Sequence, residues 1–247
     1  MNKEFEIAIE ELYVTFSKYP FKSKIEGCPC CVSDTDKFTL HSKPLRELQD
    51  EDISRYAFKA MTTWGDVNDF KHYVPRIFEL LATKELIVDI FVVLGKLEYG
   101  NWLEWDDKEK VAITNFLKAW WKYEINYVEY FDSEIFIEIN KVLKHLPDML
   151  VDWNLDLETQ GFKNYIDLLE DHYHDLKNKN KLLKALSEED LKIFISWIEE
   201  HSYKLEEAFF RYENDDKEFS DRISYICLLY TSPSPRDATL SRMPSSA

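Results

Sequence analysis

The sequence predicts an all-α protein, arranged as an irregular multi-helix bundle or as a degenerate, HEAT-like stack of helical hairpins without a sheet. Apolar residues return at every third or fourth position from Phe5 to Ile226, which is the period of helices with one buried face. The stretch rich in β-branched residues, 87–93, has no partner strand elsewhere in the chain. No consensus recurs at a spacing of roughly 34 to 47 residues, so any helical repeat is degenerate.

The elements of the first third follow in order from these apolar stripes. The first helix is predicted by a stripe near the start of the chain, formed by Phe5, Ala8, Ile9, Leu12 and Phe16. A cysteine-bearing loop at 24–44 follows, and within it the segment 33–36 has the pattern of a helix start and predicts a short helix ending near position 41. The next helix is expected over about 50–64, with Gly65 as its stop.

Three further segments are expected to be helical between positions 66 and 99. The segment 66–73 predicts a short turn of helix. Pro75 is expected to open a new helix, because proline is tolerated in a first turn. The segment 85–99 is more continuously apolar than its neighbours, so we expect it to form a central helix.

The second half predicts longer helices. A helix is expected over 107–127, with an apolar face made of Ile113, Phe116, Leu117, Trp120, Tyr123 and Tyr127. Two further stripes predict helices before Pro147 and over 162–173. The segment 187–190 resembles a capping box and is expected to open the longest helix, which continues through 212, before a last stripe ends near 226. We expect these helices to form a single domain over 1–227.

The last twenty residues, 228–247, differ in composition from the rest of the chain. They are rich in Ser, Pro and Arg, whereas the preceding helices are rich in Glu, Lys and aromatic residues. This segment resembles translated sequencing-adaptor read-through, and a natural Pro/Ser linker is the alternative. We expect a disordered tail that takes no part in the fold.

Charge and hydropathy limit the kinds of partner. The chain has 31 Lys and Arg against 47 Asp and Glu, a formal net charge of −16, so its field repels phosphate backbones and anionic lipid surfaces. The best apolar run, 86–94, is interrupted by Asp89 and is too short to span a membrane. The first residues are acidic where a secretory signal would be basic. We therefore expect a cytoplasmic protein that binds neither nucleic acid nor membrane and has a protein partner.

The sequence carries no common catalytic signature. Its five glycines are scattered, so neither a P-loop nor a dinucleotide-binding fingerprint is present. Gly-x-Ser-x-Gly and His-Glu-x-x-His motifs are also missing. No catalytic or cofactor-binding residue is predicted, and the sequence favours a protein that is not an enzyme. A hydrolase with a site dispersed over several helices stays open as a further hypothesis.

Three of the four cysteines lie within a five-residue stretch and form the main candidate site. Cys28, Cys30 and Cys31, with His41 as a fourth ligand, would supply the number of ligands that a structural zinc ion needs. The adjacent pair 30–31 fits one tetrahedral ion poorly, and no second cysteine pair exists in the helical body.

Two other interpretations of these cysteines remain open. A thiol near a helix N-terminus suits redox chemistry, although Glu26, Asp34 and Asp36 oppose thiolate formation. The structural alternative is that Pro29 shapes a turn and one or two cysteines are buried as small apolar groups.

A second candidate site is a partner-binding surface in the segment 60–73. It combines a helix break, polar residues and large aromatic residues, a composition that is typical of recognition surfaces. The alternative is that two of its aromatic residues fill the core between helices. The residues proposed for partner binding are Trp64, Asp66, Asp69, Phe70 and His72.

Several short motifs in the first third resemble a family of uncharacterised bacterial proteins. They are Gly-Cys-Pro-Cys-Cys-Val at 27–32, Lys-Pro-Leu-Arg-Glu-Leu at 43–48, Arg-Tyr-Ala-Phe-Lys-Ala at 55–60, Thr-Thr-Trp-Gly-Asp-Val at 62–67 and Pro-Arg at 75–76. The resemblance is strong over the N-terminal third and looser over the remainder. It implies a helical protein without an assigned activity, and no functional residue is carried over from it.

Two functional hypotheses follow from these observations. The favoured one is a non-enzymatic interaction or scaffold protein that presents acidic helical faces to a protein partner. The alternative is a metal-binding or thiol-redox module that uses Cys28, Cys30 and Cys31 on a helical scaffold. Zinc is the cofactor considered for the second hypothesis, and none is predicted for the first.

Overall fold

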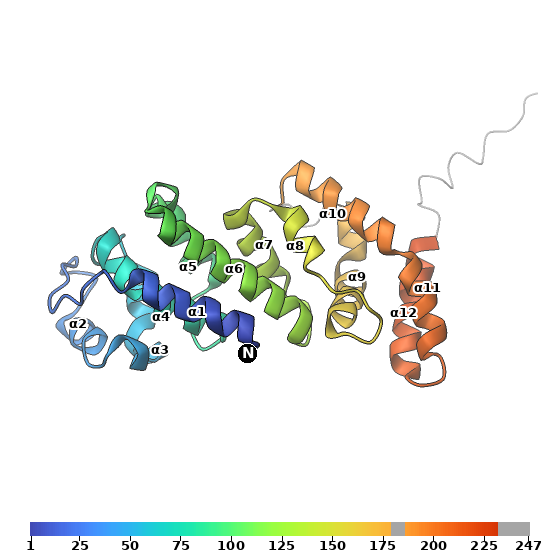
Figure 1. Cartoon of the computed structure of the whole chain (residues 1–247), viewed down its shortest axis with the longest axis horizontal. Helices are drawn as coiled ribbons and strands as arrows, with labels where there is room; N and C mark the ends of the chain where they lie inside the picture. Colours follow the sequence, from blue (N-terminus) through green and yellow to red (C-terminus); the bar gives the residue numbers. More distant parts are fainter. Residues whose placement is uncertain (179–185, 232–247) are drawn as a thin grey trace, which may run out of the picture. The chain divides into compact units, whose positions relative to one another are not determined.

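The computed structural model describes residues 1–178 and 186–231, and side chains within 1–171 and 186–228. In these residues it contains twelve α-helices, two short 3-10 turns and no strand, so the prediction of an all-α fold is confirmed (Figure 1). The β pairing found there is limited to isolated bridges that join Trp64 to Gly27 and to Ala60. No helix in this part of the chain is long and apolar enough to cross a lipid bilayer.

The Cα positions divide the chain into two compact units. The first consists of Met1–Val128 and Asp132–Trp153, and the second of Glu129–Phe131 with the residues from Asn154 onward. The single domain expected over 1–227 stays a prediction. The first unit contains α1 (Lys3–Phe16), α2 (Asp34–Leu40), α3 (Asp50–Lys59), α4 (Val67–Ala82), α5 (Ile90–Tyr99), α6 (Asp107–Tyr127), α7 (Ser133–Leu143), α8 (Leu146–Val151) and the 3-10 turns Leu45–Glu47 and Trp102–Glu104.

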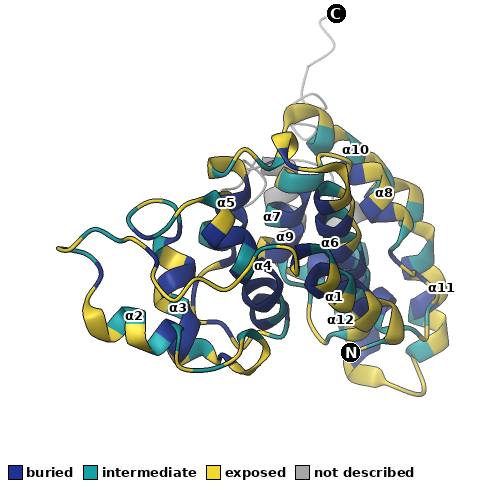
Figure 2. Cartoon of the chain, turned by 60° about the vertical axis from the view of Figure 1, so that its left-hand side comes forward, coloured by how far each residue is buried: buried dark blue, intermediate teal, exposed yellow. Residues whose placement is uncertain are grey.

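The core of the first unit lies where α1 and α4 pack against one another and α1 packs against α6. Figure 2 shows buried residues on the faces where these helices meet. The Phe116 ring of α6 lies 5.8 Å from Phe5 of α1 and 5.5 Å from Phe78 of α4, measured between ring centroids. All three side chains are fully buried, and each such burial contributes about 1.5–3 kcal/mol. The apolar stripe predicted for the first helix therefore forms part of this core.

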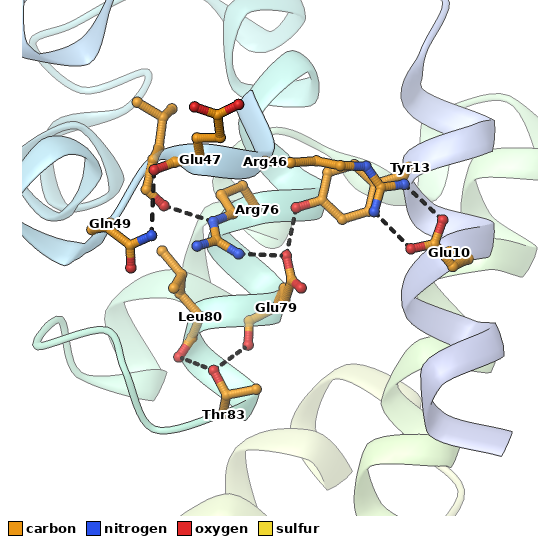
Figure 3. A network of polar contacts seen from close by, with 10 residues as sticks. Glu10, Tyr13, Arg46, Glu47, Gln49, Arg76, Glu79, Leu80 and Thr83 are labelled. Atoms are coloured by element: carbon orange, nitrogen blue, oxygen red, sulfur yellow. Dashed lines mark hydrogen bonds and ion pairs between the residues drawn. The ribbon is translucent and has the colours of Figure 1, made fainter. Parts of the chain in front are cut away.

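A second layer of polar contacts joins α1, α4 and the 3-10 turn at 45–47 (Figure 3). The Arg46 guanidinium lies 3.7 Å from the centre of the Tyr13 ring and donates two hydrogen bonds to Glu10, at 2.6 and 2.7 Å. The Tyr13 hydroxyl donates to Glu79, which also accepts from the buried Arg76 at 2.8 Å. Each charged group in this network has an opposite charge or a hydrogen-bond partner, as burial requires.

The prediction that Pro75 opens a helix is wrong. α4 begins at Val67 and continues through Pro75, which lies inside the helix. Its start is fixed earlier by a capping box, in which Asp66 accepts from the Asp69 amide and Asp69 accepts from the Asp66 amide. Proline inside a helix costs about 3 kcal/mol. Burial of most of the α4 surface between α1 and α3 offsets that cost.

Two other helix boundaries differ from the predictions. α3 ends at Lys59 rather than at Gly65, because the chain turns at Met61, which has a left-handed φ of 62°, and the Met61 amide donates to the Trp64 carbonyl. α5 begins at Ile90 rather than at 85, since the preceding residues form a loop whose Ile87 amide donates to the Asp50 carboxylate at 2.8 Å. A local turn therefore ends α3, whereas a hydrogen bond between residues 37 positions apart holds the loop before α5.

The second unit contains α9 (Gln160–Asn178), α10 (Glu188–His201), α11 (Tyr203–Tyr212) and α12 (Lys217–Thr231). α11 and α12 pack together as a hairpin, and the Tyr212 and Phe219 rings meet edge to face, with centroids 5.0 Å apart. Arg222 of α12 pairs with Asp167 and Glu170 of α9 at 2.7 and 2.6 Å.

The prediction of one long helix from 187 through 212 is wrong. It is interrupted at Ser202, so that α10 and α11 are separate. The Ser202 hydroxyl donates to the Glu199 carbonyl at 2.8 Å, and such local bonds compete with the helical ladder. α12 ends at Thr231, three residues beyond the Leu228 at which the tail was expected to begin. The rest of the predicted tail, 232–247, lies outside the described residues.

Candidate functional site

The cysteine loop has a defined backbone, because hydrogen bonds tie it both to itself and to the segment that follows α3. The amides of Cys31 and Val32 both donate to the Cys28 carbonyl at 2.9 Å. The Cys28 amide donates to the Thr63 carbonyl at 2.8 Å, which holds the loop against the chain beyond α3. Val32 is buried and anchors the end of the loop in the core. The positions of the three cysteines are therefore set by tertiary structure.

The three thiols of this loop lie close together. The Cys28 and Cys30 sulfurs are 2.9 Å apart, and the Cys30 and Cys31 sulfurs are 3.6 Å apart. All three sulfurs lie within 4.8 Å of one another, and all three cysteines are free thiols. Cys30 is exposed, whereas Cys28 and Cys31 are half-buried. The loop therefore presents a compact, accessible set of sulfur ligands.

Hydrogen bonds among the thiols separate their pKa values. The Cys30 thiol and amide, followed by the Cys31 thiol, lower the pKa of Cys28 below its ordinary value. The same contacts raise the pKa of Cys30 to about 11, because its thiol hydrogen-bonds to the Cys28 and Cys31 sulfurs. These contacts thus favour the thiolate of Cys28 over that of Cys30.

Two basic side chains of α3 lie against the loop. The Lys59 ammonium donates to the Cys31 carbonyl at 2.5 Å, and the Arg55 guanidinium contacts the same oxygen at 3.3 Å. Arg55 also pairs with Asp36 at 2.8 Å, which neutralises one of the carboxylates expected to oppose thiolate formation. The electrostatic environment is therefore more favourable to thiolates than sequence neighbours alone indicate.

His41, the fourth ligand considered from sequence, does not join the sulfur cluster. The ligand atoms that lie within 4.8 Å of one another comprise the three thiols alone among the described residues. The His41 ring instead meets Phe21 edge to face, with centroids 5.2 Å apart. Burial, and to a smaller extent the nearby His72, lower the pKa of His41, so its imidazole is neutral near pH 7.

The residues proposed for partner binding divide between the core and a helix cap. Trp64 and Phe70 are 1% and 0% exposed, so both belong to the core. Asp66 and Asp69 form the capping box of α4, and the Asp69 carboxylate is buried. His72 is half-buried, and its Nδ1 contacts the Tyr19 carbonyl at 2.8 Å. Only the Asp66 side chain, 61% exposed, is freely accessible among these five.

The structure brings the two sequence-predicted sites together. Besides the bond between Cys28 and Thr63, the Gly65 amide donates to the Glu26 carbonyl at 2.8 Å. Trp64 forms a bridge with Gly27 between these two bonds. Gly65 has a φ of 73° and a side chain there would meet Asp69 at 2.9 Å, so this position requires glycine. The segment after α3 is thus the support of the cysteine loop.

The structure contains a buried charge cluster around Glu109 that the sequence does not predict. The Glu109 carboxylate is 0% exposed and accepts hydrogen bonds from Tyr19, Lys71 at 2.8 Å and Lys18 at 2.9 Å. The Lys71 ammonium also lies 4.2 Å from the centre of the Trp105 ring. Burial alone would raise the pKa of Glu109, but the hydrogen bonds from these donors outweigh it and hold the pKa below its ordinary value. The buried carboxylate thus has two ammonium partners, one buried and one partly exposed.

The first unit also contains a cavity of about 790 Å³ between α5, α6, α7 and α8. Two ion pairs lie in its wall: Lys118 lies 3.1 Å from Asp148, and Lys141 lies 2.6 Å from Glu138. The wall also contains other titratable side chains, Glu98, Glu104, Lys144, His145 and Asp152. Its apolar wall includes Leu94, Leu97, Trp121 and Met149. Its size is within the range of ligand pockets, and burial raises the pKa of Asp152 in its wall.

The sequence contains one further signal at the thiol site, the spacing of its cysteines. Cys28 and Cys31 are separated by two residues, which is the spacing of metal-binding and redox cysteine pairs, and Cys30 lies between them. The contributions of Lys59 and Arg55 could not be found this way, because these residues lie 28 and 24 positions after Cys31. Comparisons with protein-family models, with curated proteins and with solved structures found no match for this chain.

Proposed function

We propose that the chain is a metal-binding protein whose cysteine loop takes up a soft metal ion. The observation that carries this proposal is the cluster of three thiol sulfurs within 4.8 Å of one another on a hydrogen-bonded loop. Thiolates are soft ligands and select soft ions. An ion bound about 2.3 Å from each of three sulfurs spaces them about 4 Å apart, so shifts of roughly 1 Å would complete the site.

The surroundings of the loop support this proposal. Binding replaces thiol protons with a cation, and the lowered pKa of Cys28 eases the first replacement. The Lys59 ammonium at the Cys31 carbonyl offsets part of the negative charge of the remaining thiolates, and Arg55 removes the opposing charge of Asp36. We propose that the protein resides in a reducing compartment such as the cytoplasm, because thiols that bind a metal must stay unoxidised. Thiol-redox chemistry is the competing use of the same side chains.

Thiol protection tests the proposal. The reduced full chain is incubated anaerobically with Zn(II), Cd(II) or Cu(I), and its reactive thiols are counted with a chromogenic disulfide. We expect a bound ion to protect three thiols and leave Cys227, the cysteine of α12, reactive. Cys28→Ser removes the protection, and Cys227→Ser, the matched control, keeps it. If the number of reactive thiols is the same with and without each ion, metal binding is contradicted. Thiol-redox chemistry is then the function that the loop supports.

A second candidate function is that of an interaction scaffold for a protein partner. It is favoured by two aromatic side chains on neighbouring helices: Phe38 of α2 is 75% exposed, and Phe58 of α3 is 57% exposed. Exposed aromatic residues are enriched in binding hot spots, and the net charge of −16 favours a basic partner.

A double variant tests the scaffold hypothesis. Phe38→Ser with Phe58→Ser leaves the core intact, since both side chains project into solvent. We expect it to lose cross-linking to a partner in extracts of the source cells while keeping the helical circular dichroism of the wild type. Leu103→Ser, which alters a 62% exposed apolar residue elsewhere, is the control. Equal cross-linking of all three proteins contradicts a role for this surface.

A further inference from the structure

The geometry points to Cu(I), held by the sulfurs of Cys28, Cys30 and Cys31 alone, as the ion that this loop takes up. This inference rests on the metal-binding function proposed above and names its ion. It depends on the composition of the ligand set, on the loop backbone and on the accessibility of the sulfurs.

The ligand set consists of sulfur only. Within the part of the chain that the structure describes, no imidazole nitrogen or carboxylate oxygen belongs to the group of ligand atoms around these thiols. A structural zinc ion takes four protein ligands in a tetrahedron, so this loop leaves it one ligand short. Cu(I) is a soft ion that is satisfied by two or three thiolates, and it prefers sulfur to nitrogen or oxygen. A three-sulfur set therefore matches Cu(I) better than zinc.

The backbone assigns different roles to the three sulfurs. The amides of Cys31 and Val32 converge on the Cys28 carbonyl, and this turn fixes Cys28 and Cys31 as a pair separated by two residues. Both are half-buried; the Cys28 amide is bonded to Thr63, beyond α3, and the Cys31 carbonyl accepts from Lys59 and Arg55 of α3. Cys30 projects from the middle of the turn, is exposed, and lies 2.9 Å from the Cys28 sulfur. We therefore assign the pair as the anchoring ligands and Cys30 as the third, exchangeable ligand.

Charge and access agree with this assignment. Three thiolates with one Cu(I) carry two negative charges; the Lys59 ammonium lies at the Cys31 carbonyl and offsets part of them, and Arg55 neutralises the nearby Asp36 carboxylate. The reaction is a coordination step without a change of oxidation state: three S–H bonds release their protons to solvent, and three Cu–S bonds form. Because Cys30 is exposed, an incoming thiol can replace its sulfur at the metal, which permits transfer of the ion.

Copper binding by the full chain tests the inference. The reduced protein is titrated anaerobically with Cu(I) in competition with a chromophoric Cu(I) chelator, and the copper sites are examined by X-ray absorption. We expect one Cu(I) per chain with three sulfur ligands in the wild type and two in Cys30→Ser, which should bind about tenfold more weakly or worse. Cys227→Ser is the control and should match the wild type. Circular dichroism confirms that each variant folds.

The outcomes separate this inference from the function on which it rests. Copper with a nitrogen or oxygen ligand, or a Cys30→Ser site identical to that of the wild type, overturns the assignment of the ligands. Zn(II) held against a strong zinc chelator while Cu(I) is released overturns the choice of ion but leaves a metal-binding protein. Failure of every ion to protect the thiols overturns the proposed function itself.

Discussion

Replacing Glu109 with glutamine is expected to leave the Lys71 ammonium buried without its counter-charge. Glu109 is fully buried, Lys71 is 7% exposed, and their charged atoms are 2.8 Å apart. Removing one partner of a buried ion pair costs about 3–5 kcal/mol, because the remaining charge is desolvated without compensation. The Trp105 ring 4.2 Å from the ammonium offsets about 1 kcal/mol of this loss. We expect Glu109→Gln to lower the free energy of unfolding by about 2–4 kcal/mol.

The loss of stability in Glu109→Gln should become smaller as the pH falls. The pKa of Glu109 is lower in the folded protein than in the unfolded chain. Its ionised form therefore stabilises the folded protein above the unfolded-state pKa, and this stabilisation is lost as the pH falls through the folded-state pKa. The difference in stability between wild type and Glu109→Gln should therefore be constant near pH 7 and shrink in acid, below about pH 4.

Urea denaturation of the full chain, followed by circular dichroism and tryptophan fluorescence, measures this effect. The control is Lys118→Met, which breaks the exposed pair with Asp148 and should change stability by less than about 1 kcal/mol. The double variant Glu109→Gln with Lys71→Met should recover part of the loss, since no isolated charge is left. The reasoning would be refuted if Glu109→Gln lowered the free energy of unfolding by less than about 1 kcal/mol. It would also be refuted if the difference in stability between wild type and Glu109→Gln did not change with pH.

Three further predictions concern the support of the cysteine loop. Gly65→Ala should destabilise the protein by about 1 kcal/mol or more, because φ is 73° there, whereas Gly95→Ala, an open helical position, should stabilise it by about 0.5–1 kcal/mol in the same urea assay. Asp66→Ala removes the N-cap of α4 and should cost about 1 kcal/mol by thermal melting, with Asn68→Ala nearly neutral. Trp64→Ala should cost about 3–5 kcal/mol and speed thiol modification in the loop; an unchanged rate would show that the loop does not depend on this side chain.

The helical fold could be predicted because its signal is local. The stripe from Phe5 to Phe16 is buried as predicted, since period and burial are directly linked. The helix over 107–127 buries the predicted face as far as Trp120, whereas Tyr123 is half-buried and Tyr127 is exposed near the helix end, so that part of the predicted face is wrong. Cap patterns were equally informative: the Ser33 capping box begins α2, and Ser187 begins α10. Features encoded within one helical turn were thus within reach of the sequence.

Features that depend on distant residues could not be predicted. Pro75 has the local pattern of a helix start, yet α4 continues through it because α1 and α3 pack against this helix. The true start of α4, the capping box of Asp66 and Asp69, is a local pattern that the sequence does contain. At the candidate site, the closeness of the three cysteines was evident, whereas the approach of Lys59 and the tie to Thr63 require the fold. The pairing of Lys71 with Glu109 joins residues 38 positions apart, which no spacing rule reveals.

The bridge between Trp64 and Gly27 gives the thiol site an intrinsic optical reporter. A carbon atom added at Gly27 would lie 3.4 Å from the indole of Trp64, so this fluorophore rests directly on the chain segment that leads into Cys28. Under the proposed function, we expect the emission of Trp64, one of seven tryptophans in the chain, to change when the loop takes up an ion. Site occupancy can be followed in real time by the difference in fluorescence between the wild type and Trp64→Phe, without any external dye.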